Sequence, residues 1–286
     1  MDRISLSAPA KINLGLWVGR SRLDGYHEII TTLVPLELHD LIYIRKEKMG
    51  VKVKTSGINL DLPQKHNLAY RAAELFFQET KIQSGCLITI KKNIPVGAGL
   101  GGGSSNAATV LIGLNRLFGS PLNYTGLKKL AMQLGSDVPF FLLSVPCVAR
   151  GRGEKLRPVR LPRLDLILHY PGFSISTAWA YNQLDRIREK LTSPLISPKI
   201  LCYKLRRNEL AGLAEQVYNS FETIVFSKYP HLAQVKNLLL ANGAIVASLS
   251  GSGSTVYGLL SAPDPMAELT NSGLPWILTR SRPSDA

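Results

Sequence analysis

The chain has 286 residues, of which 45% are apolar, and this length predicts a protein of two domains with a sizeable buried core. Its formal net charge of +14 favours polyanionic partners. No aromatic-rich RNA motif, zinc knuckle or basic helix accompanies the charge, so we expect no nucleic acid as a partner, and the excess of positive charge stays unexplained. The odd number of cysteines argues against a disulfide framework, and no apolar run is long enough to span a bilayer, so we expect a cytoplasmic protein.

An extended strand is predicted at residues 4–16, because its apolar residues share one parity and Lys11 and Asn13 project from the other face. These two polar residues also interrupt the run, so a signal peptide is not expected. A lone lysine on a strand is commonly a solvated edge residue. Its place after Ala-Pro-Ala in an otherwise apolar strand favours a functional position for Lys11 instead.

The glycine-rich stretch PVGAGLGGGSSNAA, residues 95–108, follows an alternating strand at residues 86–94 and precedes a helical apolar pattern that ends at Gly119. Glycines let backbone N–H groups approach an anion, and a helix start adds its positive dipole end. A P-loop would need Lys and Ser/Thr after its last glycine, and a dinucleotide site an acid roughly 20 residues later. Neither is present, so the stretch predicts a phosphate site of another kind.

The charges around this loop support that prediction. Asp137 is the only carboxylate between Glu79 and Glu154, whereas several lysines and three arginines share the interval. An aspartate before an apolar segment is commonly a helix N-cap or Asx-turn residue. Beside a phosphate cradle, the alternative for Asp137 is a general base that takes a proton from an attacking hydroxyl.

A segment dense in glycine, proline and charge, residues 151–163, marks the predicted boundary between domains 1–155 and 156–286. Beyond it the patterns predict a strand, two helices and a strand–glycine loop–strand unit. In chain order these are residues 164–170, 178–191, 232–241 and 244–260.

Four motifs in this order resemble the GHMP kinases of small metabolites: SAPAKINLGL, PVGAGLGGGSSNAA, LGSDVPFF and SLSGSGSTVYGL. LDGYHEIITTL at residues 23–33 and YPGFSIST at residues 170–177 are similar to the branch that phosphorylates 4-diphosphocytidyl-2-C-methyl-D-erythritol. One departure is NSFE at residues 219–222, where the family commonly has an Asn-Asp pair. The resemblance implies an α+β fold with an N-terminal domain like the second domain of ribosomal protein S5 and a ferredoxin-like C-terminal domain.

The resemblance also implies roles for individual residues. Asp137 would be the catalytic base and Lys11 its electrostatic partner, while Asn13 would orient the substrate. The ATP phosphates would lie in the glycine loop, where the hydroxyls of Ser104 and Ser105 would approach the metal or the phosphate oxygens. Mg²⁺ would be held mainly by the phosphates, so no metal site made of protein side chains is expected. The implied ATP-binding residues are Pro95, Val96, Gly97, Ala98, Gly99, Leu100, Gly101, Gly102, Gly103, Ser104 and Ser105.

For the cytidine substrate, the resemblance implies that Tyr26 and Tyr181 stack on the cytosine and that His27 reads its edge. Thr177 is a further substrate-binding residue, and a second glycine loop at residues 250–254 would close over the diphosphate. Lys92 and Asn67 are candidates for the adenosine side.

The reaction implied is ATP-dependent phosphorylation of the 2-hydroxyl of 4-diphosphocytidyl-2-C-methyl-D-erythritol in the non-mevalonate isoprenoid pathway. Two alternatives stay open: a GHMP kinase acting on homoserine or a mevalonate derivative, and a catalytically silent sensor that binds ATP and a metabolite. The presence of both Lys11 and Asp137 favours an enzyme over a sensor. We expect a monomer or a weak homodimer.

Overall fold

A computed structural model of the chain describes residues 2–58, 63–187, 197–261, 269 and 272–283. They form two compact units that interleave in the sequence. Unit 1 comprises Met1–Ala10, Leu38–Val96 and Gly101–Ser144, and unit 2 comprises Lys11–Glu37, Gly97–Leu100 and Val145–Ala286. A single domain boundary at residue 155 stays a prediction.

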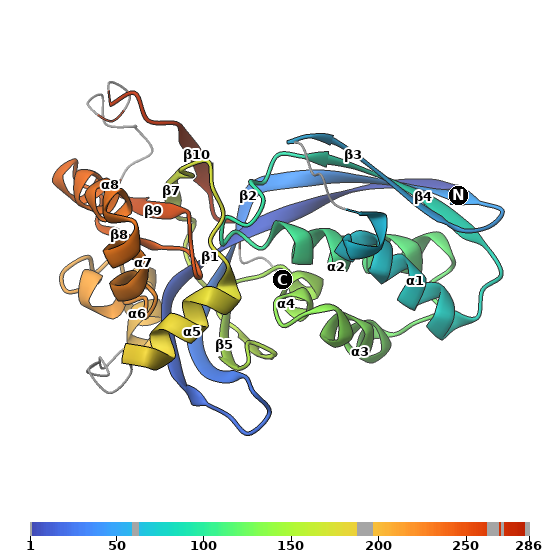
Figure 1. Cartoon of the computed structure of the whole chain (residues 1–286), viewed down its shortest axis with the longest axis horizontal. Coiled ribbons are helices and arrows are strands. Elements are labelled where there is room, and N and C mark those ends of the chain that lie inside the picture. The colour runs from blue at the N-terminus through green and yellow to red at the C-terminus, as the bar shows by residue number, and fades with distance from the viewer. Residues whose placement is uncertain (1, 59–62, 188–196, 262–268, 270–271, 284–286) are drawn as a thin grey trace. The chain divides into compact units, whose positions relative to one another are not determined.

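The sheet of unit 1 is built from long and short strands. β3 (Val51–Gly57) pairs in parallel with β4 (Gly85–Lys92), and β4 pairs antiparallel with residues 41–47 of β2 (His27–Glu47). β1 (Arg3–Ser21) also pairs with β2. Figure 1 shows helices α1 and α2 on one side of the β3–β4 part of this sheet.

Four helices accompany the sheet in unit 1. α2 lies very close to the sheet, because a Cβ added at Gly113 would lie 2.6 Å from Cδ1 of Ile44. α2 ends where the sequence predicted, with Phe118 as the C-cap and Gly119 at a φ of +80°. A short 3₁₀ turn at Gln64–His66 precedes the first helix. The helices are α1 (Leu68–Thr80), α2 (Gly102–Leu117), α3 (Tyr124–Leu134) and α4 (Val138–Leu143).

Unit 2 contains a four-stranded antiparallel sheet in the order β10-β7-β9-β8. Numbered within this sheet alone, the order is 4-1-3-2, which is the ferredoxin-like arrangement that the resemblance implied. The strands are β7 (Asp165–His169), β8 (Val246–Leu249), β9 (Val256–Leu260) and β10 (Trp276–Arg280). Residues 29–33 of β2 continue into unit 2, where they pair with β5 (Cys147–Gly151), which pairs with β6 (Lys155–Pro158).

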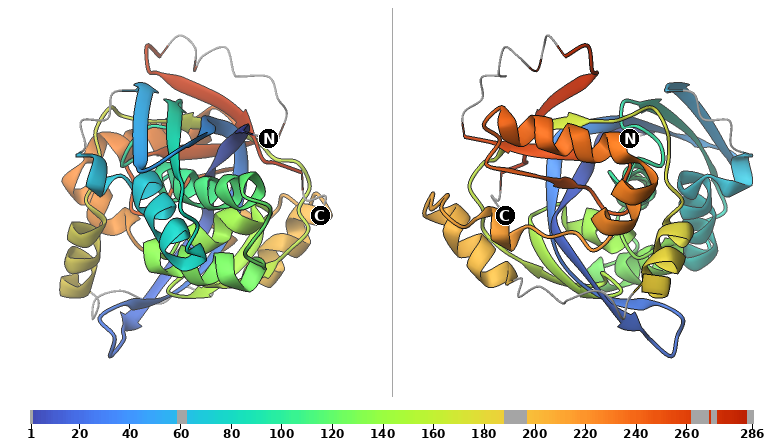
Figure 2. Two further views of the ribbon diagram at one scale, coloured as in Figure 1. Left: turned by 90° about the vertical axis from the view of Figure 1, so that its right-hand side faces the viewer. Right: turned by 60° about the vertical axis from the view of Figure 1, so that its left-hand side comes forward.

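Helix α8 contacts β8 and β9, and the right-hand view of Figure 2 shows it along this sheet. α8 matches the helix predicted at residues 232–241, and α5 matches the one at 178–191, whose last four residues lie outside the described part. The helical segments of unit 2 are α5 (Thr177–Ile187), α6 (Pro198–Arg206), a 3₁₀ turn at Ala214–Gln216, α7 (Glu222–Lys228) and α8 (Pro230–Ala241).

Side chains of the N-terminal hairpin form part of the core of unit 2. Leu16 and Val18 of β1 and Ile29 of β2 belong to one buried cluster with residues of the C-terminal helices and sheet. Burial of such side chains stabilises the fold by roughly 1.5–3 kcal/mol each. The N-terminal hairpin, by which we mean residues 11–37, is therefore an integral part of unit 2.

All three cysteines are buried thiols with no disulfide. Burial raises the pKa of Cys86 and of Cys147 to about 12, so neither thiol is a nucleophile at neutral pH. Within the described residues, no helix is long and apolar enough to cross a membrane.

Candidate active site

Lys11 is a buried residue of β1, with 4% of its surface exposed. Its Nζ donates to Oδ1 of Asn13 at 2.7 Å and to the carbonyl oxygen of Gly99 at 3.0 Å, and its backbone N–H donates to Leu100 O. Burial excludes a solvated edge lysine. The strand lysine instead holds the part of the glycine loop that belongs to unit 2.

Asn13 is buried beside Lys11, and its Nδ2 donates to Oγ1 of Thr31 at 3.0 Å. The hydroxyl of Tyr257 donates to the backbone carbonyl oxygen of Asn13 at 3.1 Å. The predicted alternation of burial holds for residues 3–7, but every residue from 8 to 16 is buried. The polar face of this stretch is therefore interior, and its amide and ammonium groups need the partners they have.

The second glycine loop, residues 250–254, meets the same cluster within unit 2. Oγ of Ser250 donates to the carbonyl oxygen of Gly99 at 3.0 Å. A Cβ added at Gly251 would lie 3.4 Å from Oδ1 of Asn13 and 3.6 Å from Nζ of Lys11. Segments around residues 11, 99 and 250 are thus brought together within unit 2.

The NSFE segment positions the second glycine loop. Nδ2 of Asn219 donates to the carbonyl oxygens of Leu249 and Gly251 at 2.7 and 2.9 Å. Oε1 of Glu222 accepts from the Leu249 N–H at 3.0 Å. Ser220 stands where the family commonly has an aspartate. Its Oγ accepts a hydrogen bond from the Val18 N–H at 2.9 Å, so a neutral side chain makes the contact to β1 at this position.

The first part of the glycine loop, residues 97–100, is tightly enclosed by unit 2. Gly97 and Gly99 have φ values of +65° and +79°, which other residues rarely adopt. A Cβ at Gly99 would lie 2.1 Å from the carbonyl oxygen of Ser250, and one at Gly97 would lie 2.5 Å from Cβ of Ser174. Both glycines are required by the fold.

The second part of the loop forms the start of α2 in unit 1. Gly101 is the N-cap at a φ of +71°, and the first turn of the helix carries no acidic residue. Gly103 is exposed, and a Cβ there would lie 3.6 Å from Cδ1 of Leu68, an ordinary contact. Oγ of Ser105 is buried without a hydrogen-bond partner among the described residues. This end suits an anion, because free N–H groups and the dipole end meet there.

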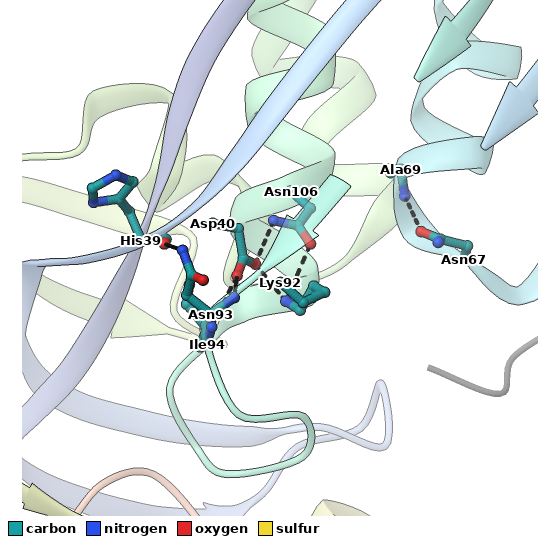
Figure 3. A network of polar contacts seen from close by, with 8 residues as sticks. All are labelled: His39, Asp40, Asn67, Ala69, Lys92, Asn93, Ile94 and Asn106. Carbon is teal, nitrogen blue, oxygen red and sulfur yellow. Dashed lines mark hydrogen bonds and ion pairs between the residues drawn. The ribbon is translucent and has the colours of Figure 1, made fainter. Parts of the chain in front are cut away.

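A buried carboxylate fastens both flanks of the loop in unit 1 (Figure 3). Asp40 accepts the N–H groups of Asn93 and Ile94 at 2.8 and 2.9 Å, Nδ2 of Asn106 at 2.8 Å, and Nζ of Lys92. Asp40 has no exposed surface, so these donors replace its hydration. We call this network the Asp40 clasp.

The two adenosine candidates have structural partners in unit 1. Lys92 belongs to the Asp40 clasp, and Oδ1 of Asn67 caps α1 by accepting the N–H of Ala69 at 2.9 Å. Their roles toward adenosine stay predictions.

Asp137 stands at the N-cap position of α4 and is half-buried. It has helical backbone angles, and its side chain makes no capping hydrogen bond. Capping, which was the alternative interpretation from the sequence, is therefore not what this carboxylate does.

The residues predicted to hold cytosine have specific partners in unit 2. The rings of His27 and Tyr181 stack at 4.7 Å between centroids, and Nε2 of His27 lies 2.9 Å from Oδ1 of Asp185. Tyr26 is half-exposed, and the guanidinium of Arg152 lies 4.5 Å from its ring centroid. Oγ1 of Thr177 lies 3.1 Å from Oγ of Ser252, which links this predicted substrate residue to the second glycine loop.

Sequence reasoning missed the supporting carboxylates Asp40, Asp185 and Glu222. Asp40 interrupts an apolar strand pattern, which is a signal for a buried polar group with a partner. Asp185 follows Tyr181 by four residues on a helix, so the two share a face. Neither signal identifies the distant partner.

Comparison with known proteins identifies two family models along the chain. Residues 67–144 match the GHMP kinases N terminal domain, and residues 202–271 match the GHMP kinases C terminal model. Both matches agree with the predicted α+β fold of the two-domain GHMP type.

Curated relatives cover nearly the whole chain. A 4-diphosphocytidyl-2-C-methyl-D-erythritol kinase from Syntrophotalea carbinolica is 42% identical over 91% of this chain and 90% of its own length. The protein of the same name from Methylacidiphilum infernorum is 41% identical, covering 92% and 88%.

Solved structures give the same result. A crystal structure of 4-(cytidine 5'-diphospho)-2C-methyl-D-erythritol kinase has a TM-score of 0.83 at 35% identity, covering 97% of this chain and 99% of the other. Homoserine kinase from Cytophaga hutchinsonii reaches a TM-score of 0.75 at 18% identity over 99% of this chain and 95% of its own, which shows a shared fold alone. The predicted resemblance is thereby confirmed, and the chain belongs to the 4-diphosphocytidyl-2-C-methyl-D-erythritol kinases of the GHMP kinase family.

Proposed function

We propose that this chain transfers the γ-phosphoryl group of ATP to the 2-hydroxyl of 4-diphosphocytidyl-2-C-methyl-D-erythritol, in the non-mevalonate isoprenoid pathway. The observation that carries the proposal is the contact between the buried Nζ of Lys11 and the carbonyl oxygen of Gly99. It joins the strand lysine to the glycine loop although the residues are 88 positions apart. The names of the relatives support the cytidine ester over homoserine or a mevalonate derivative.

Asp137 is proposed as the general base that removes the proton of the 2-hydroxyl as it attacks the γ-phosphorus. Its half-buried position and its place directly before the apolar helix α4 support this role, and it does not cap that helix. Lys11 is proposed to stabilise the negative charge that develops on the attacking oxygen. The oxygens of Asn13 and Gly99 accept hydrogen bonds from its ammonium and so orient the group before the reaction.

The ATP phosphates are proposed to lie over the glycine loop, residues 95–105, at the start of α2. The buried and unpartnered hydroxyl of Ser105 fits a ligand to phosphate or to Mg²⁺, and Ser104 beside it is half-buried. When bound, Mg²⁺ would neutralise charge on the phosphate oxygens. The helix dipole and the backbone N–H groups supply the protein's share of that stabilisation.

The cytidine end of the substrate is proposed to lie at Tyr26, His27 and Tyr181. Rings stack on any base, so an edge contact is needed to choose cytosine. Thr177 and Asn13 would contact the rest of the substrate, and the loop at residues 250–254 would cover its diphosphate. We further propose a cytoplasmic monomer or weak homodimer that binds no nucleic acid, with segments 1–155 and 156–286 as its domains.

Replacing Asp137 by Asn tests the mechanism. As a general base, the carboxylate should contribute roughly 10²–10⁴ in rate, so Asp137→Asn should lower kcat by that factor and leave ATP affinity nearly intact. Turnover is measured with ATP and the cytidine substrate, and affinity by titration with a nonhydrolysable ATP analogue. Asp165→Asn is the matched control, because that carboxylate pairs with Arg280 in unit 2.

Three results would contradict parts of the proposal. A near-normal kcat in Asp137→Asn would remove Asp137 from the chemistry. Wild-type turnover of homoserine or mevalonate in preference to the cytidine ester would overturn the substrate. ATP binding without any turnover would favour the silent sensor.

A further inference from the structure

One imidazole in unit 2 is held from two sides by a single helix. Nε2 of His27 lies 2.9 and 3.1 Å from the two carboxylate oxygens of Asp185, and the ring stacks on Tyr181 with planes 27° apart. Asp185 and Tyr181 lie one turn apart on α5. The side chain of His27 is 8% exposed. The stack fixes the plane of the ring, and the carboxylate fixes its rotation within that plane.

The carboxylate also decides where the imidazole carries its proton. An ionised carboxylate can only accept hydrogen bonds, so Nε2 must be the donor. In the neutral imidazole, the other nitrogen then has a lone pair and can only accept. Nδ1 has no hydrogen-bond partner within the described part of the chain. One nitrogen is therefore engaged by the protein, and the other stays available to a ligand.

We infer that Asp185 is a positioning residue that makes His27 select a pyrimidine with an exocyclic amino group. The inference rests on the proposed placement of the cytosine edge at His27. The amino group at position 4 of cytosine donates to the Nδ1 lone pair. Uracil presents a carbonyl oxygen there, so two acceptors would face each other, and an unmatched polar edge is penalised strongly.

The chemistry of position 185 therefore controls base choice, although Asp185 need not touch the base. Without the carboxylate, the imidazole loses the bond that sets its rotation and its proton. With a donor in its place, Nε2 would have to accept, Nδ1 would carry the proton, and the ring would match a carbonyl. Tyr181 would still stack in both cases, because stacking does not distinguish between pyrimidines.

The test compares kcat/KM for 4-diphosphocytidyl-2-C-methyl-D-erythritol and its uridine analogue, using the full-length enzyme at saturating ATP. Asp185→Ala should lower the cytidine-to-uridine ratio about tenfold, the equivalent of one neutral hydrogen bond. Asp185→Lys, which supplies only donors, should lower it further, and Asp185→Glu should restore part of it. KM for ATP should stay within about twofold in all three, because the transferred phosphoryl group is untouched. Asp165→Ala serves as the control, since its partner is Arg280.

A second measurement needs no variant of Asp185. In ¹⁵N-histidine-labelled wild-type enzyme, the His27 resonances, assigned with His27→Gln, should show a protonated Nε2 and an unprotonated Nδ1. A protonated Nδ1 would overturn the inference, as would a cytidine-to-uridine ratio that stays within about twofold in both Asp185→Ala and Asp185→Lys. A wild-type enzyme indifferent to the base would instead overturn the proposed cytosine site. The two failures are thus distinguishable.

Discussion

The two ends of the first glycine loop contain glycine for different physical reasons. Gly97 and Gly99 have positive φ values, and an added Cβ at either would collide with Ser174 or with the backbone at Ser250. Gly103 has a helical backbone, is exposed, and leaves room for a Cβ. Glycine near a helix start is less stable than alanine by up to about 1 kcal/mol. The fold explains the first two glycines, whereas the third has no such constraint in the fold and is the position where we propose that a phosphate approaches.

This comparison teaches that a glycine-rich motif mixes structural and ligand-contacting positions. Gly102 belongs with the structural set, because a Cβ there would lie 3.1 Å from both Nζ of Lys92 and Cγ2 of Ile94. A substitution at Gly101 or Gly102 should therefore perturb folding as well as the proposed binding of phosphate. Gly103 is the position at which the two effects separate.

The largest effect is expected at the Asp40 clasp, which fastens the flanks of the loop. Asp40→Asn leaves the buried ammonium of Lys92 without its counter-charge, which should cost about 3–5 kcal/mol of unfolding free energy. The double variant Asp40→Leu with Lys92→Met removes both charges and should be much closer to wild type. Urea denaturation measures both. A single variant that loses less than about 1 kcal/mol would show that the clasp does not fasten the loop.

The next largest effect is expected at Gly99. Gly99→Ala adds strain at positive φ, about 1–2 kcal/mol, and overpacking against Ser250, about 1–3 kcal/mol. The control is Gly119→Ala, which has the same φ within a degree but no heavy atom within 4 Å of the added Cβ. It should lose only the strain. Equal losses of unfolding free energy in the two variants would show that the close backbone contact at Gly99 is not a constraint.

The smallest effect on folding is expected at Gly103. Gly103→Ala should leave the unfolding free energy unchanged or raise it by up to about 1 kcal/mol. KM for ATP should rise about tenfold, the equivalent of one lost contact to a phosphate, while KM for the cytidine substrate stays nearly constant. Steady-state kinetics with each substrate varied in turn measure both. An unchanged KM for ATP would mean that the phosphates do not approach α2 at this residue.

Local patterns predicted the elements that local interactions determine. The strand before the glycine loop, the helix after it and the cap at Gly119 follow from spacing along a few turns of chain. The burial of Lys11 and Asn13 did not follow, because a strand buried on both faces ordinarily has a continuous apolar run, whereas the alternation seen here is typical of a strand with one solvated face.

The carboxylates that support the site could not be predicted for a related reason. Asp40 meets Lys92 across 52 positions, and Asp185 meets His27 across 158. A single aspartate carries no signal for a partner at that distance. No local pattern determines which strands become neighbours either. The order of the strands in unit 2 could be expected only from the resemblance to a family.

The interleaving of the two units has a consequence for the order in which the chain can fold during synthesis. Residues 11–37 emerge from the ribosome early, yet some of their partners in unit 2 come near the end of the chain: the bond from Tyr257 to Asn13 spans 244 positions, and the one from Arg282 to Leu36 spans 246. Unit 1 needs nothing beyond Ser144 and can be complete earlier. Contacts of such high sequence separation slow folding, because the chain entropy is lost before they form. The apolar side chains of the N-terminal hairpin therefore stay without their partners in unit 2 until translation is almost finished.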